Sequence, residues 1–270
     1  MVRFLRISGA VAGSVAVACI TLAGAVPGAA SAAGRTPAAA AVQVAAARVT
    51  SPAYVPAKRT LVYGMHGNDV RALQQRLAQL EYYPGPADGQ FGADTLEAVW
   101  AFQEVQGLSA DGIVGPVTEH ALVSPRAPQS RHPRGGALRV EVNLHLRVLL
   151  LYRDNKLSLV SHVSAGGGYY YCSDGSCGYA ITPTGHFTTT VFMPGWVTVP
   201  LGQMYNPVFF IGTAYAIYGD VPVPWFPDSH GCVRIWMDAA AWFHKRVRVG
   251  GKHPTPVYIR GIAPYNSLAN

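Results

Sequence analysis

Residues 229–234 read Ser229-His230-Gly231-Cys232-Val233-Arg234, which places a thiol two residues after an imidazole in a turn that contains glycine. A free cysteine has a pKa of about 8.5, and a neighbouring imidazole or a cluster of backbone N–H groups lowers that value. A structural or disulfide-bonded cysteine is the competing interpretation. The polar and basic neighbours favour Cys232 as a nucleophile, with His230 as the nearest group to take its proton.

The other cysteines of the chain have separate explanations. Cys19 lies in an apolar N-terminal leader, and Cys172 and Cys177 lie close together in a loop rich in Tyr, Ser and Gly. In an oxidising compartment we expect the latter two to form a disulfide, which leaves Cys232 as the single unpaired thiol. The sequence has no HExxH motif and no paired CxxC motifs, so it predicts neither a metal site nor an organic cofactor.

Residues 1–32 have the pattern of a secretory signal peptide. Arg3 and Arg6 form a basic start, Ile7 to Val26 is apolar, and Ala30-Ser31-Ala32 supplies a cleavage site of small residues. An uncleaved membrane anchor is the alternative, because the apolar run approaches the roughly 20 residues that span a bilayer. Glycines within the run and the cleavage site favour removal. We expect a secreted protein associated with the cell wall, in contact with a membrane only before cleavage.

The charge of the chain suits an anionic partner. Its formal net charge is +7, and removal of Arg3 and Arg6 lowers this to +5. A basic exported protein is suited to a cell wall rich in carboxylates and phosphates. Nucleic acid is disfavoured as a partner, because the protein is exported and lacks a cluster of basic and aromatic residues.

Composition and periodicity divide the rest of the chain into four parts. Residues 33–57 are an Ala/Pro-rich spacer, 58–124 a compact helical unit, 125–137 a linker rich in Pro, Arg and Gly, and 138–262 a unit dominated by strands. In the helical unit, helices are expected over Val70–Leu80 with Asn68 as cap, around Leu96–Phe102, and from Pro116. In the strand-rich unit, a helix is expected over Asp238–Val247, with Asp238 as cap and a stop at Gly250-Gly251. Strands are expected over 138–144, 148–152, 157–163, 185–192 and 256–259, the second and third forming a hairpin at turn 153–156. Trp242 and Phe243 are expected in the core.

The helical unit contains an internal repeat. Ala87–Val99 matches Ala110–Leu122 in the frame ADGxxGxxTxxA followed by an aliphatic residue, in which Asp-Gly makes a turn and Thr enters the next helix. With Gly67–Gln74 and Ala101–Gln103, this frame resembles the three-helix peptidoglycan-binding domain. The resemblance implies peptidoglycan, both stem peptides and glycan, as the partner. A small helical bundle without a ligand is the alternative.

The strand-rich unit resembles the L,D-transpeptidase catalytic domain of the YkuD-like family. The resemblance covers 138–261 and rests on Thr182–Phe187 and above all on 229–234. It implies a multidomain protein, a small all-α peptidoglycan-binding domain followed by a mainly β catalytic domain with one or two helices.

The resemblance further implies that Cys232 attacks the carbonyl between the third stem residue and a terminal D-Ala and forms a thioester. An amine of a second stem resolves the thioester into a cross-link, whereas water would make the enzyme a carboxypeptidase. Carbapenems are acyl donors for this family.

The residues of the hexapeptide agree with acyl transfer. Free N–H groups in the turn that includes Ser229 and Gly231 can hold an oxyanion, a contribution worth about 10²–10³ in rate for one donor. Arg234 either orients a carboxylate of the substrate or pairs with an acidic residue of the protein.

One position departs from the family pattern. Tyr218 stands where the family places an upstream histidine that serves as general base, and a phenol with a pKa of about 10 is a weak base at neutral pH, although it can orient another group. Three interpretations follow: His230 is the base, a distant histidine such as His162 or His186 replaces it, or the domain is a wall-binding pseudoenzyme. We favour His230.

Overall fold

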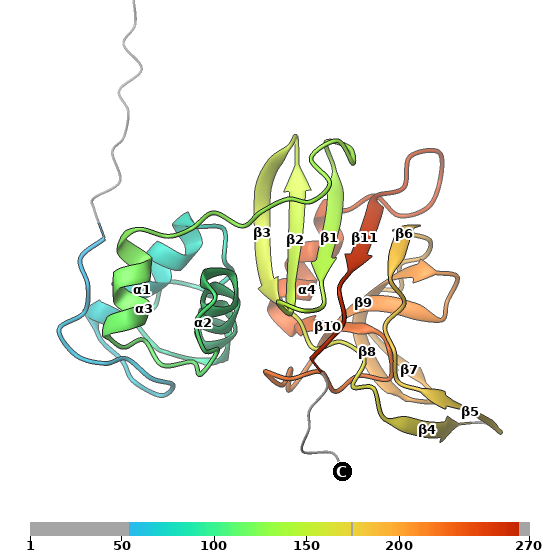
Figure 1. Cartoon of the computed structure of the whole chain (residues 1–270), viewed down its shortest axis with the longest axis horizontal. Coiled ribbons are helices and arrows are strands. Elements are labelled where there is room, and N and C mark those ends of the chain that lie inside the picture. The colour runs from blue at the N-terminus through green and yellow to red at the C-terminus, as the bar shows by residue number, and fades with distance from the viewer. Residues whose placement is uncertain (1–53, 174, 265–270) are drawn as a thin grey trace, which may run out of the picture. The chain divides into compact units, whose positions relative to one another are not determined.

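The computed structural model describes residues 54–173 and 175–264, which fall within one compact unit (Figure 1). The expected signal peptide (1–32) and most of the first spacer (33–57) lie outside the described residues. Within the described part, no helix is long and apolar enough to cross a membrane.

Three helices form the N-terminal domain, as the sequence predicts: α1 (Asn68–Gln79), α2 (Ala93–Gln106) and α3 (Pro116–Val123). Pro116 occupies the first turn of α3, where its missing N–H costs nothing. The prediction that Asn68 caps α1 is wrong, because the helix already includes Asn68 and Gly67 is the cap residue. A Cβ at Gly67, whose φ is +149°, would lie 2.6 Å from Asp69 Oδ1, so only glycine fits there.

A buried glutamine organises each copy of the repeat. Gln74 Nε2 donates to Asp88 Oδ1 (3.0 Å), to the Gln90 carbonyl (2.9 Å) and to Thr95 Oγ1 (3.1 Å), and its Oε1 accepts from Gly89 N (2.8 Å). In the second copy Gln103 makes the equivalent bonds, to Asp111 Oδ1, the Ile113 carbonyl, Thr118 Oγ1 and Gly112 N. The Asp, Gly and Thr of the frame are therefore the partners of one amide, which explains their spacing.

Gln74→Ala is expected to destabilise the protein by about 2–3 kcal/mol, because buried partners of the amide are left without hydrogen bonds. Urea unfolding of the full chain would measure the loss. Gln75→Ala is the matched control: Gln75 is its exposed neighbour on α1, and its loss should cost less than about 0.5 kcal/mol. Equal effects of the two substitutions would contradict this role for Gln74.

The C-terminal domain contains two main sheets. One has the order β3-β2-β1-β11-β6, the other the order β10-β9-β8-β7, and β4 and β5 form a separate hairpin. The strands are β1 (Arg139–Asn143), β2 (Val148–Arg153), β3 (Lys156–His162), β4 (Tyr170–Ser173), β5 (Ser176–Tyr179), β6 (Gly185–Thr188), β7 (Trp196–Val199), β8 (Gly202–Ile211), β9 (Tyr215–Asp220), β10 (Val233–Trp236) and β11 (Pro256–Arg260).

The predicted β2–β3 hairpin is confirmed, as are the strands at β1 and β11. The strand expected over 185–192 ends at Thr188. Beyond it the chain leaves β11 and joins the second sheet, where Thr190 N donates to the Phe209 carbonyl and Phe192 pairs with Val208.

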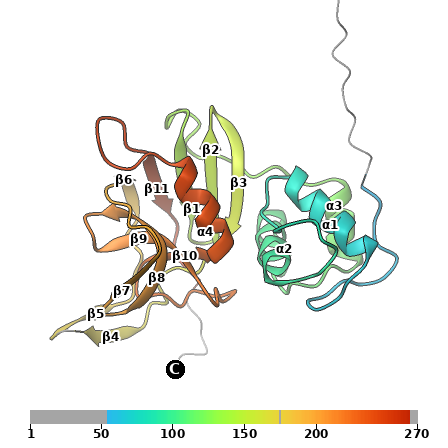
Figure 2. The same ribbon diagram turned by 180° about the vertical axis from the view of Figure 1, so that it is seen from behind.

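Helix α4 (Met237–Phe243), followed by a 3₁₀ turn (His244–Arg246), packs against β8, β9 and β10 (Figure 2). Ala239, Ala240 and Phe243 of this helix are buried in the core between the two sheets, and Trp242 lies at its edge. The prediction that Asp238 caps the helix is wrong, because the helix already begins at Met237 and Trp236 is the cap residue.

Strand β2 is apolar on both faces, and this fixes the relation between the helical domain and the first sheet. Leu149 and Leu151 lie in the core of the β domain, whereas Leu150 and Tyr152 belong to the apolar cluster of the helical domain. The edge strand β3 is also covered, since Val160 N donates to the Glu81 carbonyl at 2.7 Å.

The linker is also bound to the sheet. Ser130 Oγ donates to Glu141 Oε1 at 2.6 Å, and Arg131 N donates to Glu141 Oε2 at 2.8 Å. Residues 125–137 therefore connect the two domains along a packed surface. The linker joins domains that share a core, since Leu150 and Tyr152 of β2 are covered by the helical domain.

Candidate active site

The cysteine turn, residues 229–232, leads directly into β10. Gly231 N donates to Ser229 Oγ at 3.0 Å, and the same hydroxyl donates to the Cys232 carbonyl, so Ser229 closes the turn from inside. Gly231 has a φ of +132°, and a Cβ there would lie 2.8 Å from the Ile181 carbonyl oxygen. The turn needs glycine for both reasons.

Cys232 is the free cysteine among the described residues. Its Sγ accepts a hydrogen bond from Ala216 N at 3.4 Å. Burial raises the pKa of the thiol, while the Ala216 N–H and the nearby charge of Arg234 act in the opposite direction. At neutral pH the resting thiol is therefore protonated and needs a base.

The turn offers backbone N–H donors next to the thiol, and one of them is engaged within the turn. Gly231 N–H is used by Ser229 Oγ. The N–H groups of His230 and Cys232 have no protein acceptor within the described ranges. These two groups, rather than Gly231 N–H, are free to receive an oxyanion.

Cys232 opens into a cleft of about 410 Å³. Tyr218 and His230 line the same cleft, so three of the residues singled out from the sequence come together here. The remaining walls come from the β4–β5 hairpin, the turn between β7 and β8, and Thr213 and Ala214 between β8 and β9.

The β4–β5 hairpin carries a disulfide between Cys172 and Cys177, which face each other across the two strands. Tyr171, Ser176 and Cys177 of the hairpin line the cleft. The sequence reveals the cysteine pair but not its place beside Cys232, because nothing local shows how a short hairpin packs on a distant turn.

His230 is held between two tyrosines. Its ring lies edge-on to Tyr171 at 4.7 Å and to Tyr169 at 5.5 Å between centroids. Burial and then the charge of Arg234 lower the pKa of His230, and Asp228 opposes them. The imidazole is thus neutral at pH 7, the form that accepts a proton, although no hydrogen bond joins it to Cys232 in the described structure.

Tyr218 and Arg234 are neighbours across the parallel β9–β10 pair. Arg234 Nε donates to Tyr218 Oη at 3.0 Å, and the guanidinium also pairs with Asp220 (3.2 Å) and Asp228 (3.6 Å). Of the two roles predicted for Arg234, the structure contains the pairing with acidic residues. Burial is the main cause that raises the pKa of Tyr218 to about 12, so the phenol stays protonated and is a poor base.

The distant histidines do not reach the cleft. His162 is fully buried between Glu104 and the Pro224 carbonyl. His186 packs its ring against His132 and Tyr258. Neither lines the cleft of Cys232, which leaves His230 as the histidine that does so among the described residues.

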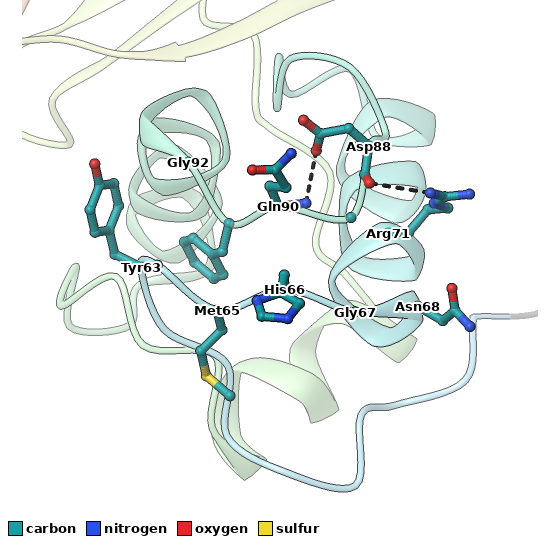
Figure 3. Close-up of a pocket in the computed structure, with 12 residues that line it drawn as sticks. Tyr63, Met65, His66, Gly67, Asn68, Arg71, Asp88, Gln90 and Gly92 are labelled. Carbon is teal, nitrogen blue, oxygen red and sulfur yellow. Dashed lines mark hydrogen bonds between the residues drawn. The ribbon is translucent and has the colours of Figure 1, made fainter.

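A second cavity, of about 500 Å³, lies in the helical domain at the first copy of the repeat (Figure 3). Tyr63, Met65 and His66 line it from one segment, and Arg71, Asp88 and Gln90 line it from α1 and the repeat turn. In Figure 3 Asp88 lies between Arg71 and Gln90: its carbonyl accepts from Arg71 (3.2 Å) and its carboxylate from Gln90 N (2.8 Å). The cavity therefore combines aromatic and polar walls.

Comparison with known proteins assigns both domains. A family model described as a putative peptidoglycan binding domain matches residues 66–122, and one described as the L,D-transpeptidase catalytic domain matches residues 137–259. A crystal structure of the L,D-transpeptidase from Xylanimonas cellulosilytica is 36% identical, with a TM-score of 0.69, and the match covers 76% of this chain and all of that one.

Two curated relatives match over shorter stretches. The N-acetylmuramoyl-L-alanine amidase CwlM of Mycobacterium tuberculosis is 47% identical over 58 residues, which are 22% of this chain and 14% of CwlM. The zinc D-Ala-D-Ala carboxypeptidase of Streptomyces albus G is 50% identical over 64 residues, 22% of this chain and 24% of the relative. The chain thus spans less than a quarter of the length of either curated relative.

The catalytic-domain match, the peptidoglycan-binding match and the full coverage of the Xylanimonas structure agree with the two domains described above. The chain belongs to the L,D-transpeptidase family and carries a peptidoglycan-binding domain before its catalytic domain.

Proposed function

We propose that the protein is a secreted L,D-transpeptidase that cross-links peptidoglycan stem peptides through a thioester on Cys232. The observation that carries the proposal is the cleft in which a lone thiol, a neutral imidazole and two unpaired backbone N–H groups meet. Acyl transfer needs these three elements: a nucleophile, a group that takes its proton, and donors for the oxyanion.

In the proposed reaction, Cys232 Sγ attacks the carbonyl that joins the third stem residue to a terminal D-Ala, and His230 takes the thiol proton. The N–H groups of His230 and Cys232 stabilise the oxyanion. The intermediate collapses to a thioester, and the proton returns to the departing amine of D-Ala. The amine of a second stem then attacks the thioester, forms the new amide and releases the thiol. The distance between His230 and the thiol closes when substrate binds, as is common for catalytic hydrogen bonds.

The helical domain is proposed to hold the polymer. Its cavity, lined by Tyr63, His66, Arg71, Asp88 and Gln90, offers an aromatic surface for sugar rings and charged groups for a stem peptide. The signal peptide pattern of residues 1–32 supports export to the wall where this polymer lies.

A wall-binding pseudoenzyme is the second candidate. It is favoured by Tyr218, whose high pKa makes it a poor substitute for a histidine base, and by the missing hydrogen bond between His230 and Cys232. The two candidates differ in whether Cys232 can be acylated.

Incubation of the full chain with a carbapenem is expected to add one drug molecule per protein, measured by intact-mass spectrometry. The adduct forms because the thiolate opens the β-lactam ring and the acyl-enzyme persists. Cys232→Ala should give no adduct. A wild-type protein that remains unmodified would favour the pseudoenzyme.

His230→Ala is expected to lower the acylation rate by about 10²–10⁴, the range typical of a lost general base. Tyr218→Phe should lower it less than tenfold, because a protonated phenol takes no proton from the thiol. Stopped-flow fluorescence or timed mass spectra would give both rates. Rapid acylation of His230→Ala would show that another group is the base.

Muropeptide analysis after incubation with donor and acceptor stems should reveal dimers joined through third-position residues. The expectation follows from an amine, rather than water, as the acceptor in the proposed reaction. Shortened monomeric stems without dimers would indicate a carboxypeptidase, and Cys232→Ala should yield neither product.

A further inference from the structure

A buried group of charges joins the helical domain to the catalytic domain. Glu104 of α2 approaches His162 Nδ1 of β3 with both carboxylate oxygens, at 2.9 and 3.0 Å, and Arg147 Nε donates to the same carboxylate at 2.9 Å. The side chains of Glu104 and His162 are each exposed by 1% or less. The ring of Trp100 in α2 lies 5.6 Å from the imidazole between centroids, in a tilted arrangement, and Glu97 of the same helix also acts on His162 through its charge.

The contacts of His162 fit a protonated ring. Its Nε2 faces the Pro224 carbonyl at 3.0 Å, and a carbonyl only accepts hydrogen bonds, so Nε2 carries a hydrogen. Its Nδ1 faces both oxygens of the Glu104 carboxylate, an arrangement that favours a hydrogen on Nδ1 as well. Both N–H groups are present in the imidazolium, and the geometry therefore describes a carboxylate that fixes a charged ring, which in turn fixes a backbone carbonyl.

Pro224 lies in the segment between β9 and the cysteine turn. Two residues after His162, Ser164 Oγ donates to the Phe226 carbonyl (2.8 Å) and accepts from Asp228 N (3.0 Å). Ser229 N then donates to the Ala165 carbonyl at 2.9 Å. The chain that follows β3 thus holds the segment 224–229 at successive points, and the His162–Pro224 contact is the first of them.

We propose that Glu104 of the peptidoglycan-binding domain is a positioning residue for the active site, which acts through His162 and the Pro224 carbonyl to hold the segment that carries the cysteine turn. The helical domain is then part of the catalytic scaffold as well as a wall anchor. The effect on acylation rests on the proposed function, whereas the effect on the segment does not.

The contact depends on pH in a definite direction. Burial acts to lower the pKa of His162, but the charge and hydrogen bond of Glu104, with smaller contributions from Glu97 and the Pro224 carbonyl, raise it overall. A raised pKa means that the stabilisation is fully present below the unfolded value of about 6.5 and is lost as pH rises through the folded pKa. The charged groups that act on the ring are Glu104 and Glu97 from α2, and Arg147 from the turn before β2 pairs with Glu104.

Glu97, like His162, has a raised pKa, so the test must separate the titration of Glu97 from that of His162. Burial, opposed by His162 and reinforced by Glu104, raises its pKa to about 8, and its Oε2 has no hydrogen-bond partner among the described residues. Glu97→Gln keeps the neutral form at every pH, so it removes this second titration without removing the side chain.

The test compares Glu104→Gln with Glu119→Gln in the full chain by hydrogen exchange and by carbapenem acylation. Glu119 is a matched buried carboxylate of the helical domain that binds Tyr54 and Ala57, away from β3. Glu104→Gln should speed exchange in peptides covering 221–231 by about tenfold and lower the maximal acylation rate by about 10- to 100-fold. Glu119→Gln should do neither.

A pH series separates positioning from a general loss of packing. In the Glu97→Gln background, the ratio of acylation rates with and without Glu104 should fall toward one as pH rises through the pKa of His162, because a neutral ring has no charge for Glu104 to fix. A ratio independent of pH would overturn the proposal, as would unchanged exchange in 221–231.

Two further readouts keep the test decisive. If Glu104→Gln does not fold, Arg147→Gln, at the more exposed end of the same group, should produce a smaller increase of exchange in the same peptides, and no increase would overturn the proposal. If the wild-type protein is not acylated at all, the proposed enzymatic function fails, and the exchange measurement alone decides the role of Glu104.

Discussion

The parallel pairing of β10 with β9 is the constraint on which the active site depends. It sets Arg234 opposite Tyr218 and Val233 opposite Ile217, so Cys232 enters the strand level with Ala216, whose N–H reaches the sulfur. Because side chains alternate along a strand, Ala216, Tyr218, Cys232 and Arg234 share one face. A shift of one residue would turn the thiol into the core and the apolar side chains of Val233 and Ile235 toward the cleft.

The same register explains how this chain accommodates a tyrosine at position 218. The phenol is buried, and its oxygen is held by Arg234, which is itself neutralised by Asp220 and Asp228. The position has thus become part of a hydrogen-bonded wall. His230 of the cysteine turn is neutral and lies in the cleft. Its ring packs against Tyr171 of the disulfide hairpin and Tyr169 just before it. Burial is the main cause that lowers the pKa of His230, and Arg234, which holds Tyr218, contributes in the same direction while Asp228 opposes it.

Much of the fold can be predicted from the sequence where structure is local. The three helices, the β2–β3 hairpin and the repeat depend on periodicity and turn residues within a short window. The repeat shows the Asp, Gly and Thr of each copy at fixed spacing, but it does not show that Gln74 and Gln103 are their common partners. Strands β4, β5, β7, β9 and β10 have only four to six residues, and β8 contains Asn206 and Pro207 in its interior, so none of the six is predicted from local sequence and only pairing with other strands defines them.

The candidate site shows the same division. Cys232, His230 and Tyr218 could be selected from motif positions, whereas the contribution of Tyr171 and the removal of His162 and His186 from the cleft depend on tertiary packing. The position of His162 could not be inferred, because its partner Glu104 lies 58 residues earlier in a different domain. The predicted caps at Asn68 and Asp238 are wrong because α1 begins at Asn68 itself and α4 begins one residue before Asp238.

The apolar outer face of β2 makes the catalytic domain depend on the helical domain. Two separate family models match the two domains. Here Leu150, Tyr152 and Val160 are buried by the helical domain, and the edge of β3 is closed by the Glu81 carbonyl. A catalytic domain cut free of its partner would present an apolar sheet face beside an open strand edge, the combination that promotes aggregation. Fusion of this catalytic domain to another wall-binding module would therefore require new polar residues on β2 and β3. The domain boundary in the sequence does not mark a catalytic domain that is stable on its own.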